Sequence, residues 1–206
     1  MVAAASPAAC SDGAKKWDGK RNNGYLYYVN ASTLPAGISQ NQFESEIAYA
    51  HDIIETGGND CGLTVSSSGL GVSITRQGSA GLAAARTDGS CYGDTYDVID
   101  FGYLPSGILG RTCTQYLILP FADDRINEAD VRLNVNAGWF QYLPAACSNR
   151  YELAGVLTHE FGHVFGMGHV DESTHGQLTM STNATPCSYA DHSLGLGDYN
   201  NLHDHY

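Results

Sequence analysis

The chain has 206 residues, of which 43% are hydrophobic and 16% are charged, and its formal net charge is −12 at pH 7. This length suits one folded domain with a sizeable core, and no apolar run approaches the roughly 20 residues that cross a bilayer. The acidic balance excludes nucleic acids and anionic membranes as expected partners, because both are bound through clusters of Lys and Arg.

The first part of the chain predicts one strand, one helix and two short strands. Aromatic and β-branched residues at 25–29 are typical of a strand. Ser39, followed three residues later by Gln42, forms a capping-box pattern, and apolar residues then recur at helical spacing until two glycines end the helix. Short apolar runs at 63–65 and 70–74 are further strand candidates.

The second part predicts more strands and then a helix. Strand candidates at 98–101, 107–119 and 131–135 are separated by prolines and an acidic loop. A helix is expected to begin near Asn149 and to run into a histidine-rich segment, with apolar residues on its buried side.

Six cysteines are spread widely along the chain, without a C-x-x-C pair. Their even number predicts three disulfides, and therefore a secreted, extracellular protein. Fifteen pairings are possible for six cysteines, and the sequence does not select one. Pairing neighbours in order is the simplest guess: Cys10 with Cys61, Cys91 with Cys113, and Cys147 with Cys187.

The segment from His159 to His169 contains three potential metal ligands and one potential general base. His159 and His163 are four residues apart, so they lie on one face of a helix and can bind a single ion. Gly166 offers a place for the chain to turn, so that His169 can approach the same ion from another direction. Zinc is the expected cofactor.

Glu160 is the expected catalytic residue. Three neutral histidines leave one position of a tetrahedral zinc ion for water, whose pKa falls toward neutrality on binding. Glu160 can accept the proton as this water attacks a peptide carbonyl, and can then return it to the departing amine. The pattern predicts hydrolysis of peptide bonds.

These residues resemble the signature of the metzincin zinc endopeptidases, in which an extended His-Glu-x-x-His motif is followed by a methionine turn. Met180 stands eleven residues after His169 and is similar to that methionine. The segments 107–112, 128–134 and 196–202 are similar to an edge strand, an inner strand and the last helix of matrixin-type domains.

The resemblance implies an α/β (α+β) fold with a twisted mixed sheet, an antiparallel edge strand and an active-site helix. We expect one catalytic domain over residues 1–206. Its upper subdomain spans about 12–168, and a small lower subdomain with the methionine turn and last helix spans about 169–206. The resemblance also implies extended protein or peptide substrates, bound along the edge at 107–112, and we expect a monomer.

Two positions distinguish this chain within the resemblance. Val170 stands where known branches carry a diagnostic Ser, Asp, Glu or Pro, so the branch is left open. Thr182 stands where some members have a tyrosine ligand, so that ligand is not expected. In matrixin-like relatives the residue four before the first histidine lines the main specificity pocket. Here it is Gly155, which predicts a deep pocket for bulky apolar P1′ residues, those that follow the cleaved bond.

Structural calcium is a second candidate cofactor, since domains with this resemblance often hold it. Seven carboxylates are candidates, although their spacing is not that of an EF-hand: Asp94, Asp97, Asp100, Asp123, Asp124, Glu128 and Asp130. The remaining histidines are not expected to be ligands of the zinc site: His51, His175, His192, His203 and His205.

Two other functions fit the same ligands. One is a non-catalytic secreted binding module that zinc merely stabilises, although such a site has no use for Glu160. The other is a zinc amidohydrolase that acts on a non-peptide substrate. The candidate edge strand and methionine turn favour peptides.

Overall fold

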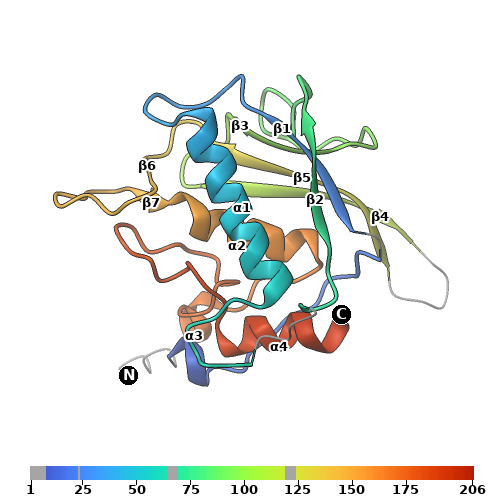
Figure 1. Cartoon of the computed structure of the whole chain (residues 1–206), viewed down its shortest axis with the longest axis vertical. Helices are drawn as coiled ribbons and strands as arrows, with labels where there is room; N and C mark the ends of the chain where they lie inside the picture. Colours follow the sequence, from blue (N-terminus) through green and yellow to red (C-terminus); the bar gives the residue numbers. More distant parts are fainter. Residues whose placement is uncertain (1–7, 23, 65–68, 119–123) are drawn as a thin grey trace.

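The computed structural model describes residues 8–22, 24–64, 69–118 and 124–206. These residues form a mixed five-stranded sheet, with helices packed against it (Figure 1). The fold is therefore α/β in the broad sense that the sequence predicted. None of the helices in the described ranges combines the length and apolar character needed to cross a bilayer.

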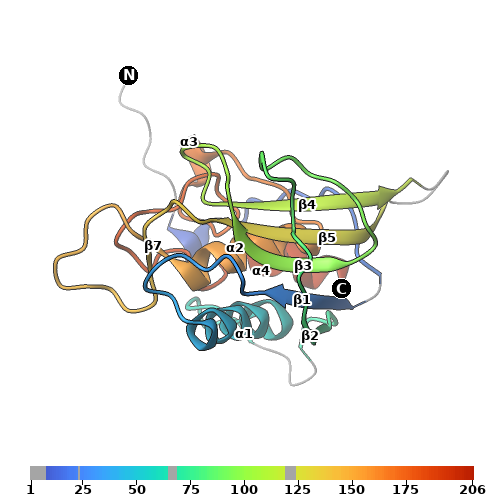
Figure 2. The ribbon, with the colours of Figure 1, turned by 90° about the horizontal axis from the view of Figure 1, so that it is seen from above.

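The sheet has an antiparallel strand at one edge. Its order is β2 (Ile74–Ser79), β1 (Tyr25–Asn30), β3 (Asp97–Gly102), β5 (Arg125–Asn134) and β4 (Gly110–Leu117). The first four strands are parallel, and β4 runs antiparallel to β5. The predicted mixed sheet with an antiparallel edge is confirmed. Figure 2 shows β4 at the opposite end of the sheet from α1.

Two long helices cover one face of the sheet. Helix α1 (Gln40–Thr56) begins with the predicted capping box between Ser39 and Gln42. It ends at Gly57, whose φ of 74° is a left-handed conformation that glycine adopts without strain. Helix α2 (Leu153–Val164) packs beside α1 and also contacts β4 and β5.

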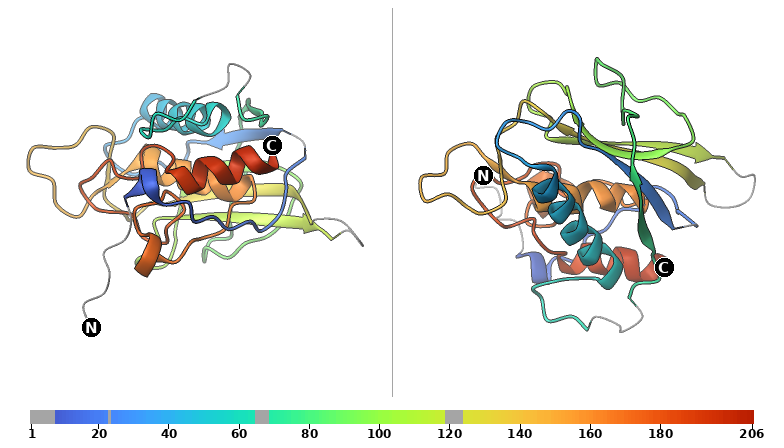
Figure 3. Two further views of the ribbon diagram at one scale, coloured as in Figure 1. Left: turned by 90° about the horizontal axis from the view of Figure 1, so that it is seen from below. Right: turned by 45° about the horizontal axis from the view of Figure 1, so that its top comes forward.

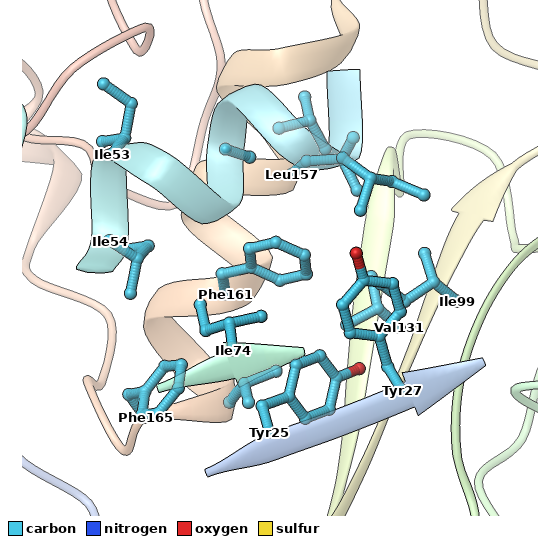
Figure 4. Close-up of a cluster of buried hydrophobic side chains, with 14 of the residues drawn as sticks. Tyr25, Tyr27, Ile53, Ile54, Ile74, Ile99, Val131, Leu157, Phe161 and Phe165 are labelled. Carbon is cyan, nitrogen blue, oxygen red and sulfur yellow. The ribbon is translucent and has the colours of Figure 1, made fainter. Parts of the chain in front are cut away.

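Alternation along β1 determines which face these helices cover. Tyr25, Tyr27 and Val29 are buried, whereas Leu26 between them is half exposed. Phe161 of α2 meets both tyrosines, with ring centroids 5.8 Å from Tyr25 and 6.5 Å from Tyr27 (Figure 4). Burial of these aromatic rings fixes the rotation of α2, and so the direction in which its polar residues point.

Charged residues on β3 and β5 are paired beneath the surface. The Arg132 guanidinium donates two hydrogen bonds to Asp100, one of them from Nε at 2.9 Å. Both residues are less than 5% exposed. Arg21 likewise pairs with Asp97. Removal of one partner from such a buried pair would cost about 3–5 kcal/mol, because the other charge would be left uncompensated.

Several element boundaries differ from the sequence-based predictions. The strand expected at 70–74 lies at Ile74–Ser79, since Gly69 and Gly71 adopt positive φ and interrupt it. Residues 63–64 form no strand, and Val65 lies outside the described residues. The acidic segment expected to be a loop forms the start of β5, beginning at Arg125.

Helix α2 begins four residues later than predicted. Its expected first turn is instead a short strand, β7 (Tyr151–Glu152), which pairs in parallel with β6 (Trp139–Phe140). The predicted last helix is confirmed as α4 (Leu196–His205), and a short helix, α3 (Glu172–His175), precedes the Met180 turn.

The N-terminal segment lies against the C-terminal helix. A short 3-10 turn at Ala9–Ser11 and the following residues run along α4 (Figure 3). Trp17 stacks on His205 with ring centroids 3.7 Å apart, and the Asn201 side chain donates a hydrogen bond to the Lys16 carbonyl. The N-terminal segment and the C-terminal helix α4 are therefore packed against each other.

Three disulfides link the predicted cysteines, neighbour to neighbour in order. Cys10–Cys61 ties the N-terminal segment to the loop after α1. Cys91–Cys113 ties the loop before β3 to the edge strand β4. Cys147–Cys187 joins the segment between β6 and β7 to the loop that follows Met180.

Replacement of both Cys147 and Cys187 by serine is expected to lower the free energy of unfolding by about 4 kcal/mol. The reason is that a cross-link over a sequence separation of 40 residues restricts the unfolded chain. Guanidinium unfolding of the variant and the oxidised wild type measures the difference. An unchanged midpoint and slope would show that this link does not stabilise the fold.

Candidate metal centre

Three histidine side chains converge on one point. His159 and His163 lie one turn apart on α2, and His169 follows the helix after a turn. The three Nε2 atoms are 3.0–3.1 Å from one another. The structure thus brings together the three ligands that the sequence predicted.

The turn that returns His169 depends on Gly166. Helix α2 ends at Val164, and Gly166 has a φ of 87°. The Gly166 N–H donates to the His163 carbonyl at 3.0 Å, which closes the last turn. A Cβ at position 166 would overlap the carbonyl oxygen of Gly19. Backbone conformation and packing therefore both require glycine here.

Backbone carbonyls orient two of the rings. Nδ1 of His159 lies 2.7 Å from the Thr179 carbonyl, and Nδ1 of His163 lies 2.8 Å from the Met167 carbonyl. A carbonyl only accepts, so each Nδ1 carries the proton and each Nε2 presents a lone pair. Lone pairs that face one another at 3 Å repel, and a cation between them relieves that repulsion.

The environment also keeps the imidazoles neutral. Burial lowers the pKa of His159. Burial together with His159 and His169 lowers the pKa of His163 to about 3, and burial together with His159 and Lys16 lowers that of His169 to about 4. Neutral imidazole is the form that binds a metal. Three neutral imidazole nitrogens that leave the fourth tetrahedral position open are a ligand set that suits zinc.

Glu160 is held between α2 and β4. It is 4% exposed, and the Thr112 hydroxyl donates to its Oε2 at 2.6 Å. Gly110 of β4 passes so close that a Cβ there would overlap the Glu160 carboxylate. Burial raises the pKa of Glu160 to about 7, against the opposing effects of Thr112 and Arg111. This carboxyl can gain or lose a proton near neutral pH.

Met180 is buried against helix α2. It is 1% exposed, and a Cβ on Gly162 would overlap its sulfur. Asp198 of α4 fixes the turn, because its carboxylate accepts the backbone N–H groups of Thr179 at 2.8 Å and Met180 at 3.2 Å. The same turn presents the Thr179 carbonyl to His159.

The centre opens into a cleft of about 960 Å³. The segment 106–112, which includes the start of β4, lines this cleft together with His159, Glu160 and His163. Residues 182–184 and Asp191 also line it. The substrate edge expected from the sequence at 107–112 therefore borders the candidate centre.

The acidic candidates for calcium divide into two kinds. Asp94, Glu128 and Asp130 place carboxylate oxygens within 4.8 Å of one another. Asp130 is 1% exposed, its Oδ2 has no hydrogen-bond partner, and burial raises its pKa to about 9. By contrast, Asp97 and Asp100 pair with arginines.

Two further acidic candidates do not join this cluster. Asp124 is exposed, and its described contact is a backbone hydrogen bond with Lys20. Asp123 lies outside the described residues.

The other histidines contact groups outside the three-histidine cluster. His51, His175 and His192 pair with Glu55, Asp12 and Glu152, respectively. His205 stacks on Trp17.

Sequence reasoning missed the polar groups that support the centre. Thr112 lies within the segment expected to bind substrate, but no pattern connects it to Glu160, 48 positions away. The position of Asp198 near the start of α4 is a local sequence signal for helix capping, and its carboxylate accepts the N–H of Gly195, three residues earlier. Its contact with the Met180 turn required the tertiary structure.

Comparison with models of known protein families and with curated proteins found no match to this chain. The functional argument therefore depends on the geometry of the site itself.

Substitution of Gly166 by alanine is expected to cost more than about 3 kcal/mol of stability and to weaken zinc binding, because the clash with Gly19 displaces His169. Gly37→Ala is the matched control, since Gly37 has a φ of 92° but open space around its Cβ position. That variant is expected to lose only about 1–2 kcal/mol. Thermal unfolding and zinc titration compare the two, and equal losses would contradict the role given to the clash.

Proposed function

We propose that this protein is a secreted zinc-dependent endopeptidase of the metzincin type, similar to the matrixins. One observation supports this most strongly: three imidazole nitrogens converge in an open cleft, with a buried carboxylate beside them. His159, His163 and His169 would hold the ion, and Glu160 would act as the general base.

Zinc in a three-histidine site supplies Lewis-acid polarisation of a carbonyl and a lower pKa for water. Glu160 would take the proton from the attacking water and pass it to the departing amine, for which a pKa near 7 is suited. The Thr112 hydroxyl keeps the carboxylate in place through both transfers.

Substrate would lie extended along β4. This strand stands at the end of the sheet order, so in the described part of the chain its outer edge has no strand partner. A peptide that adds as a further strand gains main-chain hydrogen bonds, and the scissile carbonyl then lies near the histidines. We therefore propose protein or peptide substrates, and the net charge of −12 disfavours nucleic acids and anionic membranes as partners.

The compartment and oligomeric state are part of the same proposal. Three disulfides are typical of an oxidising environment, which supports secretion. We propose a monomer, since one chain supplies all three histidines and Glu160.

The rival functions make different use of the cleft. A purely structural zinc site closes its fourth position with a side chain, whereas here the histidines line a cleft of about 960 Å³. An amidohydrolase for a small substrate does not need the long wall that residues 106–112 provide. The open strand edge favours peptides over both rivals.

Replacement of Glu160 by alanine is expected to leave zinc content unchanged and to lower kcat/KM for casein cleavage by a factor of about 10²–10⁴, because the proton acceptor is lost. Glu44→Ala is the control, since Glu44 lies on α1 and pairs with Arg76 away from the cleft. Zinc content and cleavage are measured on the same preparations. Unchanged cleavage by Glu160→Ala would overturn the assigned mechanism, and absence of cleavage by the wild type would favour a rival.

We also propose that Asp94, Glu128 and Asp130 bind a structural calcium ion. Hard oxygen donors suit calcium, and the unpartnered Oδ2 of Asp130 marks a place for a cation. Without one, burial disfavours the ionised form of Asp130, whose pKa rises to about 9.

In the presence of a metal chelator, the raised pKa of Asp130 predicts that the free energy of unfolding falls as the pH rises from about 5 to 8. The reason is that Asp130 keeps its proton in the folded state but has lost it in the unfolded state. Asp130→Asn is expected to reduce that slope by up to about 1.4 kcal/mol per pH unit. Calcium at 100 times its Kd should stabilise the wild type by about 2.7 kcal/mol but not the variant. Urea unfolding across this pH range, with and without calcium, provides the measurement. Equal calcium effects on both proteins would exclude this site.

A further inference from the structure

The loop between β6 and β7, residues 141–150, projects from the body of the molecule (Figures 1 and 2). Both of its ends adjoin the cleft, because Gly138 on one side and Asn149 and Tyr151 on the other line it. The described residues 141–148 are not part of the cleft lining. A polypeptide that extends beyond the cleft on this side therefore meets the outer part of the loop.

Two large apolar side chains stand on this outer part. Tyr142 is 78% exposed and the next residue, Leu143, is 41% exposed. Tyr189, on a neighbouring segment, is 42% exposed, and its hydroxyl accepts the Leu143 N–H at 2.7 Å. We call Tyr142, Leu143 and Tyr189 the loop surface. Exposed apolar side chains that gather at one place are typical of protein interaction sites.

The loop is fixed at its base as well as at its outer part. The Cys147–Cys187 disulfide joins it to the segment that carries Tyr189. The Cys187 N–H also donates to the Arg150 carbonyl at 2.7 Å. A loop that is already held in place loses little conformational freedom when a partner binds, so more of the contact energy appears as affinity.

Aromatic packing supports the loop surface from behind. The Tyr189 ring meets Phe140 of β6 edge to face, with centroids 5.6 Å apart, and meets His192 at 5.7 Å. His192 in turn packs on Tyr49 of α1 at 4.3 Å. Tyrosines held in this way offer a large contact area at a low cost in side-chain entropy.

Charge narrows the choice of occupant. Arg150 is the one Arg or Lys within the loop, and from Tyr151 to the end of the sequence there is none. Nucleic acids and anionic membranes require more cations than this. Two copies of the chain, each with a net charge of −12, would repel each other. A polypeptide with apolar side chains meets neither obstacle, and the proposed function puts such a chain in the adjoining cleft.

We propose that the loop surface is a second binding site for the polypeptide substrate, and that it holds apolar side chains of the part that lies outside the cleft. This inference rests on the proposed peptidase function. Once the cleft holds one part of the chain, the adjacent part meets the loop surface at a high effective concentration, so that even a weak apolar contact adds to affinity. Because this contact is the same in the ground state and the transition state, it should lower KM and leave kcat unchanged.

Peptides with one cleavable core and different extensions test this proposal. The core is extended by about ten residues, roughly 33–36 Å when fully stretched, at either its amino or its carboxyl end. One series of extensions contains Leu and Phe, and the other contains only Gly and Ser. We expect the apolar extension at one of the two ends to lower KM about tenfold relative to the Gly-Ser extension, with equal kcat. No gain at either end would overturn the proposal.

A pair of double variants assigns this gain to the loop surface. Tyr142→Ser with Leu143→Ser should remove the gain and leave cleavage of the bare core unchanged. The matched control is Tyr96→Ser with Leu26→Ser, since these side chains are 47% and 52% exposed and lie outside the loop. Equal loss of the gain in both double variants would contradict the proposal. Equally impaired cleavage of core and extended peptides by the loop variant would assign the loop a supporting role only, and would also contradict it.

Binding of the same peptides to zinc-loaded Glu160→Gln separates the loop surface from the chemistry. Tighter binding of an apolar extension, lost in the loop variant, would support the loop surface even if the wild type cleaves nothing, which would overturn the proposed peptidase. Cleavage of the core with no gain from any extension would leave the peptidase intact. Sedimentation of the wild type checks the other occupant, because a dimer that the loop variant abolishes would assign this surface to a second copy of the chain.

Discussion

The convergence of three imidazole Nε2 atoms on one point is the constraint on which the rest of the structure depends. The Nε2 atoms of His159, His163 and His169 face one another at about 3 Å, and carbonyl acceptors hold the first two rings in that orientation. The Nε2 lone pairs of His159 and His163 therefore repel each other, and the fold must supply the energy that holds these two rings together or bind a cation that offsets the repulsion.

That energy comes from the packing beneath the site. Phe161 lies on the opposite side of α2 from the ligands and is enclosed by Tyr25 and Tyr27 of β1. Apolar burial of this ring, about 1.5–3 kcal/mol for a side chain of its kind, anchors the helix. Met180 occupies the space that a side chain at Gly162 of α2 would fill. Asp198 fixes the turn that contains Met180 by accepting its backbone N–H. The hydrophobic core and the candidate metal centre therefore use opposite faces of helix α2.

Local signals in the sequence predicted local structure well. The capping box at Ser39 and Gln42, the strand at 25–29 and the histidine spacing each depend on residues a few positions apart. The strand at Ile74–Ser79 was displaced because its limits are fixed by pairing with β1 and by two glycines in left-handed conformations. Where a segment's partner is distant in sequence, the local pattern was not sufficient.

The same distinction applies to the site. The three candidate ligands and Glu160 fall within eleven residues, so their spacing along the sequence was enough to predict that they lie together. Thr112 and Asp191 reach the cleft from other elements, and nothing in their own neighbourhoods marks them. Gly155 was interpreted as a sign of open space, whereas Oε2 of Glu152 and the backbone carbonyl of Asp191 lie 3.1 and 3.2 Å from the position of its missing Cβ.

The packing of the N-terminal segment against the loop after α2 has a further consequence. The Asp18 N–H donates to the Gly166 carbonyl, and the Gly168 N–H donates to the Lys16 carbonyl, so residues 16–18 brace both sides of the approach to His169. Detachment of this segment would free the third ligand while α2 stays folded. Metal retention and the anchoring of residues 16–18 would therefore be thermodynamically linked, and a bound ion would lower the population of locally opened states that expose this segment to proteolysis.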